Sequence, residues 1–261
     1  MGAVVLILPA MGVTATYYRP LAHLLVDAGF AVAVAELRGH GQSAIRARRG
    51  VDWGYRELVE VDLPATLDAV RWRFGQKPVY VLGHSLGGQI ACLHAAAFPG
   101  EIDGVVLIAS CTLHYRCWRF PHNLGVLVFT QFVGLLSRLL GYFPGKQVRF
   151  AGREGRQQMI DWAANGRHGR WTVAGSAHDY ESLLSTVAIP VLAMSIAGDN
   201  YAPSAAVDNQ VAKMPQAAVA RHHWTAADLD RGGLHHFRWV RHSRPIVEKL
   251  VGWIEPTRSA D

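Results

Sequence analysis

The chain has 261 residues, half of them hydrophobic and 18% charged, which predicts a sizeable core in one large α/β domain or two small ones. The net charge is +6, but no stripe of basic and aromatic residues is present, so nucleic-acid binding is not expected. A basic surface favours anionic substrates or membrane surfaces only weakly.

The three cysteines, Cys92, Cys111 and Cys117, form an odd number without C-x-x-C spacing. This pattern predicts free thiols in a reducing compartment, and therefore a cytoplasmic protein. The thirteen histidines include no H-E-x-x-H motif, and both His-His pairs are adjacent in the sequence. Adjacent histidines do not easily chelate one ion on a regular element, so no metal is expected.

Apolar runs alternate with amphipathic stretches over the first 109 residues. The run over residues 3–8 lacks a preceding positive region, so it predicts a strand rather than a signal peptide. Buried strands are predicted over residues 3–8, 30–35, 79–82 and 103–109, and helices over residues 17–28 and 57–74.

The sequence Gly83-His84-Ser85-Leu86-Gly87 fits G-x-S-x-G between the third strand and a helix rich in small residues. In that context the motif predicts a nucleophile elbow, a strained turn that exposes the serine Oγ over the sheet edge. A side chain at either glycine would clash, and we expect both glycines to adopt backbone angles that only glycine tolerates. The alternative is a turn serine that caps a helix.

The composition changes abruptly between residues 112 and 178, which are rich in aromatic residues, arginine and glycine. The apolar stretch over residues 123–143 predicts a lid helix or a buried helix rather than a membrane span, because polar residues and glycines interrupt it. Its apolar side chains either bury against the core or a partner subunit, or form an acyl-binding wall over Ser85. They are Leu124, Val126, Leu127, Val128, Phe129, Phe132, Val133, Leu135, Leu136, Leu139 and Leu140.

Regular alternation returns after this segment, with a helix over residues 179–185, strands over 190–196 and 217–224, and a closing helix over 244–254. The whole pattern predicts a mostly parallel, doubly wound sheet. Asp199 follows a strand directly, and His236 lies in a loop before the last helix. Each alone could be an ordinary turn or surface residue, but the order Ser, Asp, His after these elements predicts a catalytic triad.

Four segments together resemble the serine hydrolases of the α/β-hydrolase superfamily, in their esterase, lipase and serine aminopeptidase-like branch. They are RGHGQS at residues 38–43, GHSLGG at 83–88, GDNYAP at 198–203, and His236-Phe237. The resemblance implies an α/β-hydrolase core over residues 1–111 and 179–261, with residues 112–178 as an inserted, mainly helical lid.

The resemblance also implies roles for single residues. Ser85 is expected to be the nucleophile, Asp199 the acid and His236 the base. The backbone N–H groups of Met11 and Leu86 are expected to form the oxyanion hole, and no cofactor is needed.

The chain departs from the family in three places. It has Pro9-Ala10-Met11-Gly12 where H-G-x-x-G is usual, which affects the geometry of the oxyanion donor. His235 replaces the glycine before the base, so the base could be either histidine. The usual N-terminal antiparallel strands are missing. Either a sheet edge is exposed, or the sequence starts late relative to the family.

The expected function is therefore hydrolysis of a small-molecule carboxylic ester with a hydrophobic acyl group. A peptidase, thioesterase or acyltransferase could use the same triad, and a non-catalytic binding module could keep the same fold. A serine at the elbow argues against relatives that use aspartate there. We expect no membrane span, although the lid could contact a surface, and the oligomeric state is open.

Overall fold

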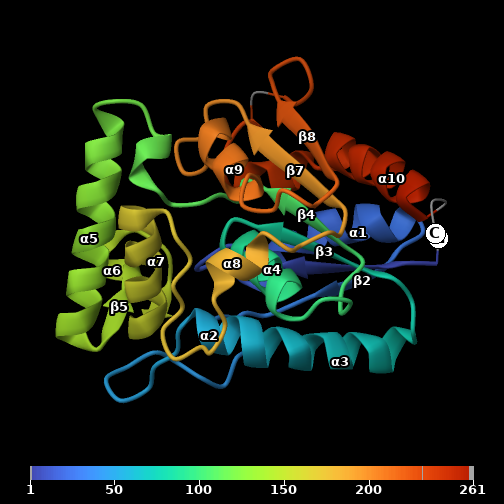
Figure 1. Cartoon of the computed structure of the whole chain (residues 1–261). Helices are drawn as coiled ribbons and strands as arrows, with labels where there is room; N and C mark the ends of the chain where they lie inside the picture. Colours follow the sequence, from blue (N-terminus) through green and yellow to red (C-terminus); the bar gives the residue numbers. More distant parts are fainter. Residues whose placement is uncertain (1, 231, 259–261) are drawn as a thin grey trace.

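A computed structural model describes residues 2–230 and 232–258 of the chain (Figure 1). Six parallel strands form its central sheet in the order β2-β1-β3-β4-β7-β8. They are β1 (Val4–Leu8), β2 (Ala31–Val34), β3 (Val79–His84), β4 (Gly104–Ile108), β7 (Val191–Ile196) and β8 (Val219–Trp224). All six lie where the sequence predicted strands, and the predicted mostly parallel α/β class is confirmed.

Helices cover both faces of the sheet, as parallel strands require. On one side α1 (Arg19–Asp27) packs against α10 (Arg244–Arg258), and on the other α4 (Leu86–Ala97) packs against α8 (Tyr180–Leu184) (Figure 1). The remaining helices of this part are α2 (Tyr55–Glu57), α3 (Leu63–Phe74), α9 (Ser204–Val211) and the 3₁₀ turns η1 (Ala15–Tyr18) and η4 (Arg238–His242).

Two details differ from the sequence-based prediction. The strand β2 is only half-buried along its length because it lies at the edge of the sheet, whereas its apolar sequence predicted burial on both faces. The helix predicted from residue 57 begins at Tyr55 and contains a π-helical stretch, η2 (Leu58–Asp62), before α3. Such wide turns depend on local packing that periodicity does not show.

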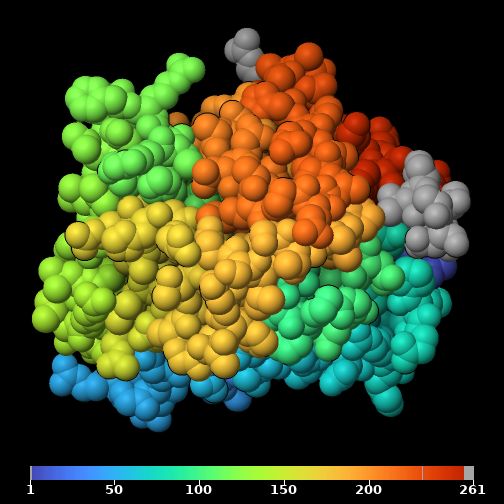
Figure 2. Space-filling view, in the orientation of Figure 1, coloured from blue at the N-terminus to red at the C-terminus, as the bar shows by residue number. Residues whose placement is uncertain are grey.

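Residues 112–178 follow β4 and precede α8 in the sequence. They form a separate group of elements along one edge of the molecule (Figure 2). These elements are η3 (Tyr115–Cys117), α5 (His122–Leu140), β5 (Tyr142–Pro144), α6 (Gly145–Val148), β6 (Arg153–Gly155) and α7 (Arg156–His168). β5 and β6 pair in antiparallel fashion. The division into a core and a lid stays a prediction.

The helix α5 packs along α7 through small and polar side chains. Its buried residues, Thr130, Val133, Gly134 and Ser137, repeat at helical spacing and form one stripe. The opposite face is exposed, so the expectation of a buried helix is wrong for most of its apolar residues. Among the described residues, α5 is the one helix whose length and composition would suffice to cross a membrane.

Candidate active site

Ser85 lies in a tight turn between β3 and α4. Its backbone angles are φ 52° and ψ −114°, in a region that residues with a side chain rarely adopt. The backbone N–H of Ser85 donates to the carbonyl of Ile108, which ties the turn to the neighbouring strand β4 (3.2 Å). Such strain typically persists where the surrounding structure enforces it and where function needs the side chain in that position.

The elbow glycines are required for space. A Cβ on Gly83 would lie 2.3 Å from the Cα of Gly88, and a Cβ on Gly87 would lie 2.1 Å from the carbonyl oxygen of Leu8. The predicted clash is therefore confirmed. The expectation of special backbone angles at the two glycines is wrong, because the positive φ of this turn is at Ser85.

Asp199 and His236 form a buried pair at the carboxyl ends of the strands. Nδ1 of His236 lies 2.8 Å from Oδ2 of Asp199, and both residues are 5% exposed. The other oxygen of Asp199 accepts the backbone N–H groups of Tyr201 (2.8 Å) and Ala202 (3.1 Å). Since a carboxylate can only accept, Nδ1 of His236 donates to Asp199, and the neutral form of this ring would have its lone pair on Nε2.

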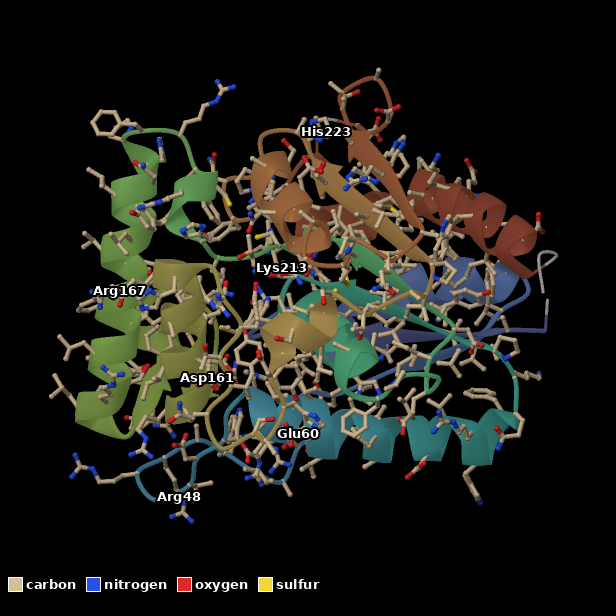
Figure 3. All side chains as sticks on the ribbon, in the orientation of Figure 1. Arg48, Glu60, Asp161, Arg167, Lys213 and His223 are labelled. Carbon is tan, nitrogen blue, oxygen red and sulfur yellow. The ribbon has the colours of Figure 1, made fainter. Side chains whose placement is uncertain are left out.

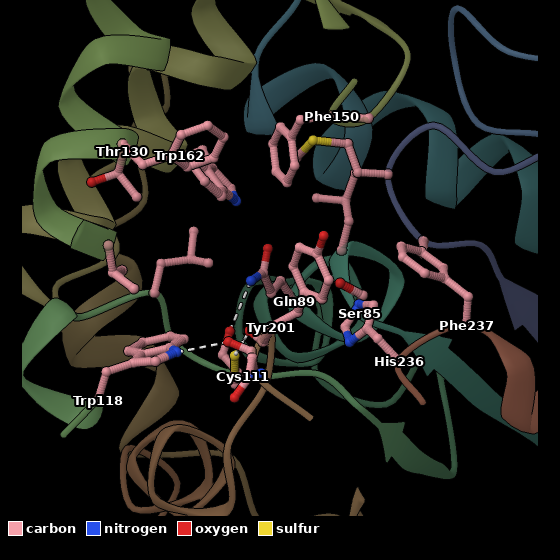
Figure 4. Close-up of a pocket in the computed structure, with 18 of the residues that line it drawn as sticks. Ser85, Gln89, Cys111, Trp118, Thr130, Phe150, Trp162, Tyr201, His236 and Phe237 are labelled. Carbon is pink, nitrogen blue, oxygen red and sulfur yellow. Dashed lines mark hydrogen bonds between the residues drawn. The ribbon is translucent and has the colours of Figure 1, made fainter. Parts of the chain in front are cut away.

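The structure separates the two adjacent histidines. His236 lines the same pocket as Ser85, and the two side chains lie together in Figure 4. His235 is exposed instead, and its Nδ1 accepts the backbone N–H of Phe237 (3.2 Å). Of the two, only His236 shares the pocket with Ser85.

The two backbone donors that we expected also border the pocket. Leu86 begins α4, so its N–H has no acceptor within the helix. Met11 follows Ala10, whose own N–H already donates to the hydroxyl of Tyr18 (2.9 Å). A turn closed by the N–H of Val13 and the carbonyl of Ala10 (3.1 Å) presents Met11 to the pocket.

His84, the residue before Ser85, connects three parts of the site. Its Nδ1 lies 2.7 Å from the hydroxyl of Tyr18, and its Nε2 lies 2.8 Å from the backbone carbonyl of His236. Tyr18 in turn accepts the N–H of Ala10. The loop after β1, the elbow and the loop of His236 are thus joined by one chain of hydrogen bonds.

The direction of these hydrogen bonds follows from the charge of His84. Burial lowers its pKa well below the ordinary value, and the nearby His236 lowers it further, so the ring is neutral. The carbonyl of His236 needs a donor, which places the proton on Nε2. Nδ1 then accepts from the Tyr18 hydroxyl. The indole nitrogen of Trp239 also approaches Nε2, but at 3.4 Å it is the weaker contact. Sequence reasoning missed this network, because no motif shows what lies beside a buried histidine.

A pocket of about 400 Å³ extends from Ser85 and His236 toward the segment of residues 112–178 (Figure 4). The lining is mostly apolar and includes Leu113, Trp118, Val126, Phe129, Phe150 and Trp162. Val126 and Phe129, which belong to the expected acyl wall, line this pocket, whereas Val133 is buried without lining it. Of the other expected residues, Leu127 and Leu136 are half-buried and the rest are exposed. The volume is in the range of small-molecule sites.

The polar groups of the pocket are few and carry no negative charge. None of the described residues that line it is Asp or Glu, while Arg149 and His122 are both present. Gln89 is fixed in place, since it accepts from the Tyr55 hydroxyl (2.6 Å) and donates to the carbonyl of Cys111 (2.8 Å). The site therefore favours a neutral or anionic, largely apolar ligand.

Comparison with known proteins gives a family match over residues 1–164, to the family described as "Hydrolase_4: Serine aminopeptidase, S33". The matched range contains the elbow and the loop after β1. It ends within α7.

Two groups of relatives match a shorter stretch. Monoglyceride lipase of Homo sapiens is 36% identical over 96 residues, which are 37% of this chain and 31% of that protein. Pimeloyl-[acyl-carrier protein] methyl ester esterase of Xylella fastidiosa (strain 9a5c) is 33% identical over 103 residues, 40% of this chain and 39% of that protein. The chain thus matches about a third of the length of these relatives.

Solved structures match over almost the whole chain at low identity. The monoacylglycerol lipase of Paleococcus ferrophilus aligns with a TM-score of 0.59 and 19% identity, over 96% of this chain and 94% of that one. A bromoperoxidase of Bacillus anthracis aligns with a TM-score of 0.59 and 17% identity, over 98% and 92%. These likenesses show the fold alone, which hosts several activities.

Proposed function

Because this chain belongs to the Hydrolase_4 (serine aminopeptidase, S33) family of α/β-hydrolases, we propose that it hydrolyses carboxylic esters of hydrophobic acyl groups. The observation that carries this proposal is an apolar pocket with Ser85 at its wall, beside the hydrogen-bonded pair of His236 and Asp199. The similarity to monoglyceride lipase and to a methyl ester esterase supports the same reaction.

In the proposed reaction, Nε2 of His236 takes the proton of Ser85 while Oγ attacks the ester carbonyl. The N–H groups of Met11 and Leu86 hold the resulting oxyanion, and Asp199 stabilises the charged imidazole. His236 then returns the proton to the departing alcohol, which leaves the acyl group on Ser85. Water adds to this acyl-enzyme by the same proton route and releases the acid.

The charge of the pocket favours an esterase over an aminopeptidase. An aminopeptidase must hold the positively charged amino terminus of its substrate, for which a carboxylate is the natural partner. The described lining residues provide no carboxylate, so an ammonium group would stay unpaired, and the positive charge of Arg149 would repel it. A neutral ester meets no such cost.

A series of p-nitrophenyl esters tests the proposal. Each methylene that enters the apolar pocket adds roughly 0.8 kcal/mol of binding, so kcat/KM should rise about fourfold per methylene from acetyl toward hexanoyl. Ser85→Ala and His236→Ala should each lower kcat by about 10⁴-fold or more, and the double variant should be no worse than the singles, because the residues act as a unit.

His235→Ala is the matched control and should keep its activity. A profile that falls steadily from acetyl upward would contradict the acyl pocket. Faster turnover of aminoacyl p-nitroanilides than of any ester would instead support the peptidase.

We also propose that the protein is cytoplasmic, as its free thiols suggest. Cys92, Cys111 and Cys117 are all free, as thiols in a reducing compartment are expected to be. Alkylation of the unreduced protein from its native cell should then modify the accessible Cys117.

A further inference from the structure

The outer face of α5 exposes a continuous row of large apolar side chains. Its members are Leu124, Val128, Phe132, Leu135 and Leu139, with Phe129 and Leu140 beside them. The five repeat at intervals of four, four, three and four residues, so they lie on one face of the helix. Val128 is 69% exposed and Leu139 is 65% exposed, and Phe120 before the helix is 78% exposed. We call these eight residues the α5 face.

A face of this kind is unusual on a water-soluble surface. Figures 1 and 2 show α5 along one edge of the molecule, with α7 on its inner side and no further element outside it. The apolar side chains are therefore not the inner surface of a packed helix pair. These side chains are therefore in contact with water, unless a partner outside the described part of this chain covers them.

The net positive charge of the protein lies in the segment that contains α5. Residues 112–178 carry nine Lys and Arg residues and two acids, Glu154 and Asp161, both buried. The whole chain has 26 basic and 20 acidic residues, so the rest has 17 and 18 and is close to neutral. The entire positive excess thus belongs to this segment.

Exposed basic residues stand at both ends of the α5 face. Arg116 and Arg119 precede the helix, and Arg138 lies in its last turn. Arg49, in the loop that Figure 3 marks with Arg48, donates to the carbonyl of Leu139 (3.4 Å) and so lies against the C-terminal end of α5. An apolar stripe framed by cations matches a surface with negative headgroups outside and hydrocarbon beneath.

We propose that the α5 face is a docking surface for an anionic lipid bilayer, on which α5 lies in the plane of the interface. A second copy of the chain fits the face poorly, because a two-fold contact would bring two strongly cationic segments together. A membrane-spanning α5 also fits poorly, because the helix would have to leave α7. There Gln131 donates to the carbonyl of Ala163 (2.8 Å), and Gly134 faces the same alanine.

The docking surface is continuous with the pocket of Ser85. Phe129 both lines the pocket and is 37% exposed, and the exposed residues His122 and Gly125 line it as well. The acyl chain of a lipid that leaves the bilayer beside α5 would reach the pocket without crossing bulk water. This route rests on the proposed function, whereas the docking itself does not.

Vesicle co-sedimentation tests the docking independently of any hydrolysis, with the full chain carrying Ser85→Ala. Binding to vesicles with about one-third phosphatidylglycerol should exceed binding to pure phosphatidylcholine by roughly tenfold or more, since each basic residue near an anionic surface contributes about fivefold. Raising the salt from about 0.1 to 0.5 M should release the protein, as expected for a peripheral contact.

Two variants and one control separate the contributions. Leu135→Asp with Leu139→Asp should reduce vesicle binding at least about tenfold, because apolar insertion is lost. Arg116→Glu with Arg119→Glu should remove the preference for anionic lipid. Trp72→Asp changes an 86% exposed apolar side chain on α3 and should have no effect. On the active chain, the leucine variants should keep their turnover of a soluble p-nitrophenyl ester, since neither residue lines the pocket.

Several outcomes would overturn the proposal. Equal binding to both kinds of vesicle would contradict the proposed preference for anionic lipid. Binding that the leucine variants retain would remove the α5 face from the contact. Protein that resists release by both high salt and alkaline carbonate would indicate a spanning helix. A dimer in size-exclusion chromatography that becomes monomeric in the leucine variants, without vesicle binding, would assign the face to a second copy.

Discussion

At the scale of single residues, the candidate site combines a strained serine, the proposed nucleophile, with a neutral histidine that we propose positions it. His84 holds the backbone carbonyl of His236 and, through Tyr18, the N–H of Ala10. These contacts fix the loops that carry the proposed base and a proposed oxyanion donor, and His84 itself does not line the pocket. The order of Ser85, Asp199 and His236 was readable from the sequence, because each residue follows a recognisable element. The role of His84 was not, because its partners come from loops that are distant in the sequence.

The variant His84→Phe should therefore slow catalysis more than it weakens binding. A flat aromatic ring is kept, but the carbonyl of His236 loses its donor, so we expect kcat to fall about tenfold or more with little change in KM. Steady-state kinetics on a p-nitrophenyl ester measure both quantities.

The matched control for this prediction is His94→Phe, on the helix α4 that follows the elbow. His94 is equally buried, its Nδ1 lies 3.1 Å from the carbonyl of Val59, and it does not line the pocket. It should lose a comparable 1–3 kcal/mol or so of stability while kcat is kept. If the His84→Phe variant is less stable but keeps its kcat, the role of His84 is structural and does not extend to catalysis.

At the scale of elements, strands were more predictable than the outer helices. The strands β1, β3, β4 and β7 are buried on both faces, so continuous apolar runs marked them directly. The helix α5 is apolar nearly all round, so its sequence could not show which face meets α7 and which meets the surroundings. The inner stripe is distinguished by small residues instead.

Gly134 is a point of close approach between α5 and α7, and its substitution can be compared with that of Gly252. A Cβ on Gly134 would lie 2.8 Å from the Cβ of Ala163, whereas a Cβ on Gly252 in α10 would meet nothing within 4 Å. Both positions gain helix propensity from alanine, which is worth roughly 0.5–1 kcal/mol. Thermal unfolding should show a higher Tm for Gly252→Ala and a lower one for Gly134→Ala. Equal gains would mean that the two helices are not tightly packed.

At the scale of the whole molecule, a buried ion pair joins the core to the segment of residues 112–178. Nε2 of His40 lies 3.1 Å from Oε2 of Glu154, and both side chains are almost fully buried. His40 belongs to the RGHGQS loop, and Glu154 to β6. Burial alone would lower the pKa of His40, but the hydrogen bond and charge of Glu154, with the charge of Glu36, raise it above the ordinary value despite Arg46.

This pair predicts a pH-dependent stability. A histidine whose pKa is raised on folding stabilises the folded state fully below its unfolded pKa of about 6.5, and the contribution is lost as the pH rises through the folded pKa. The Tm of the wild type should therefore exceed that of His40→Gln most at about pH 6, and the gap should narrow above neutral pH. The difference between the two proteins isolates this histidine from other titrating groups. A constant gap over the range would show that His40 is neutral in the fold.

The backbone of Ser85 has a consequence for how such a chain could change over generations. A residue with a side chain held at φ 52° and ψ −114° costs of order 1–3 kcal/mol, which glycine would largely avoid. A descendant freed from any demand for turnover would become more stable by exchanging the serine for glycine. Selection that keeps a hydroxyl in this turn therefore keeps it at a cost to the stability of the protein.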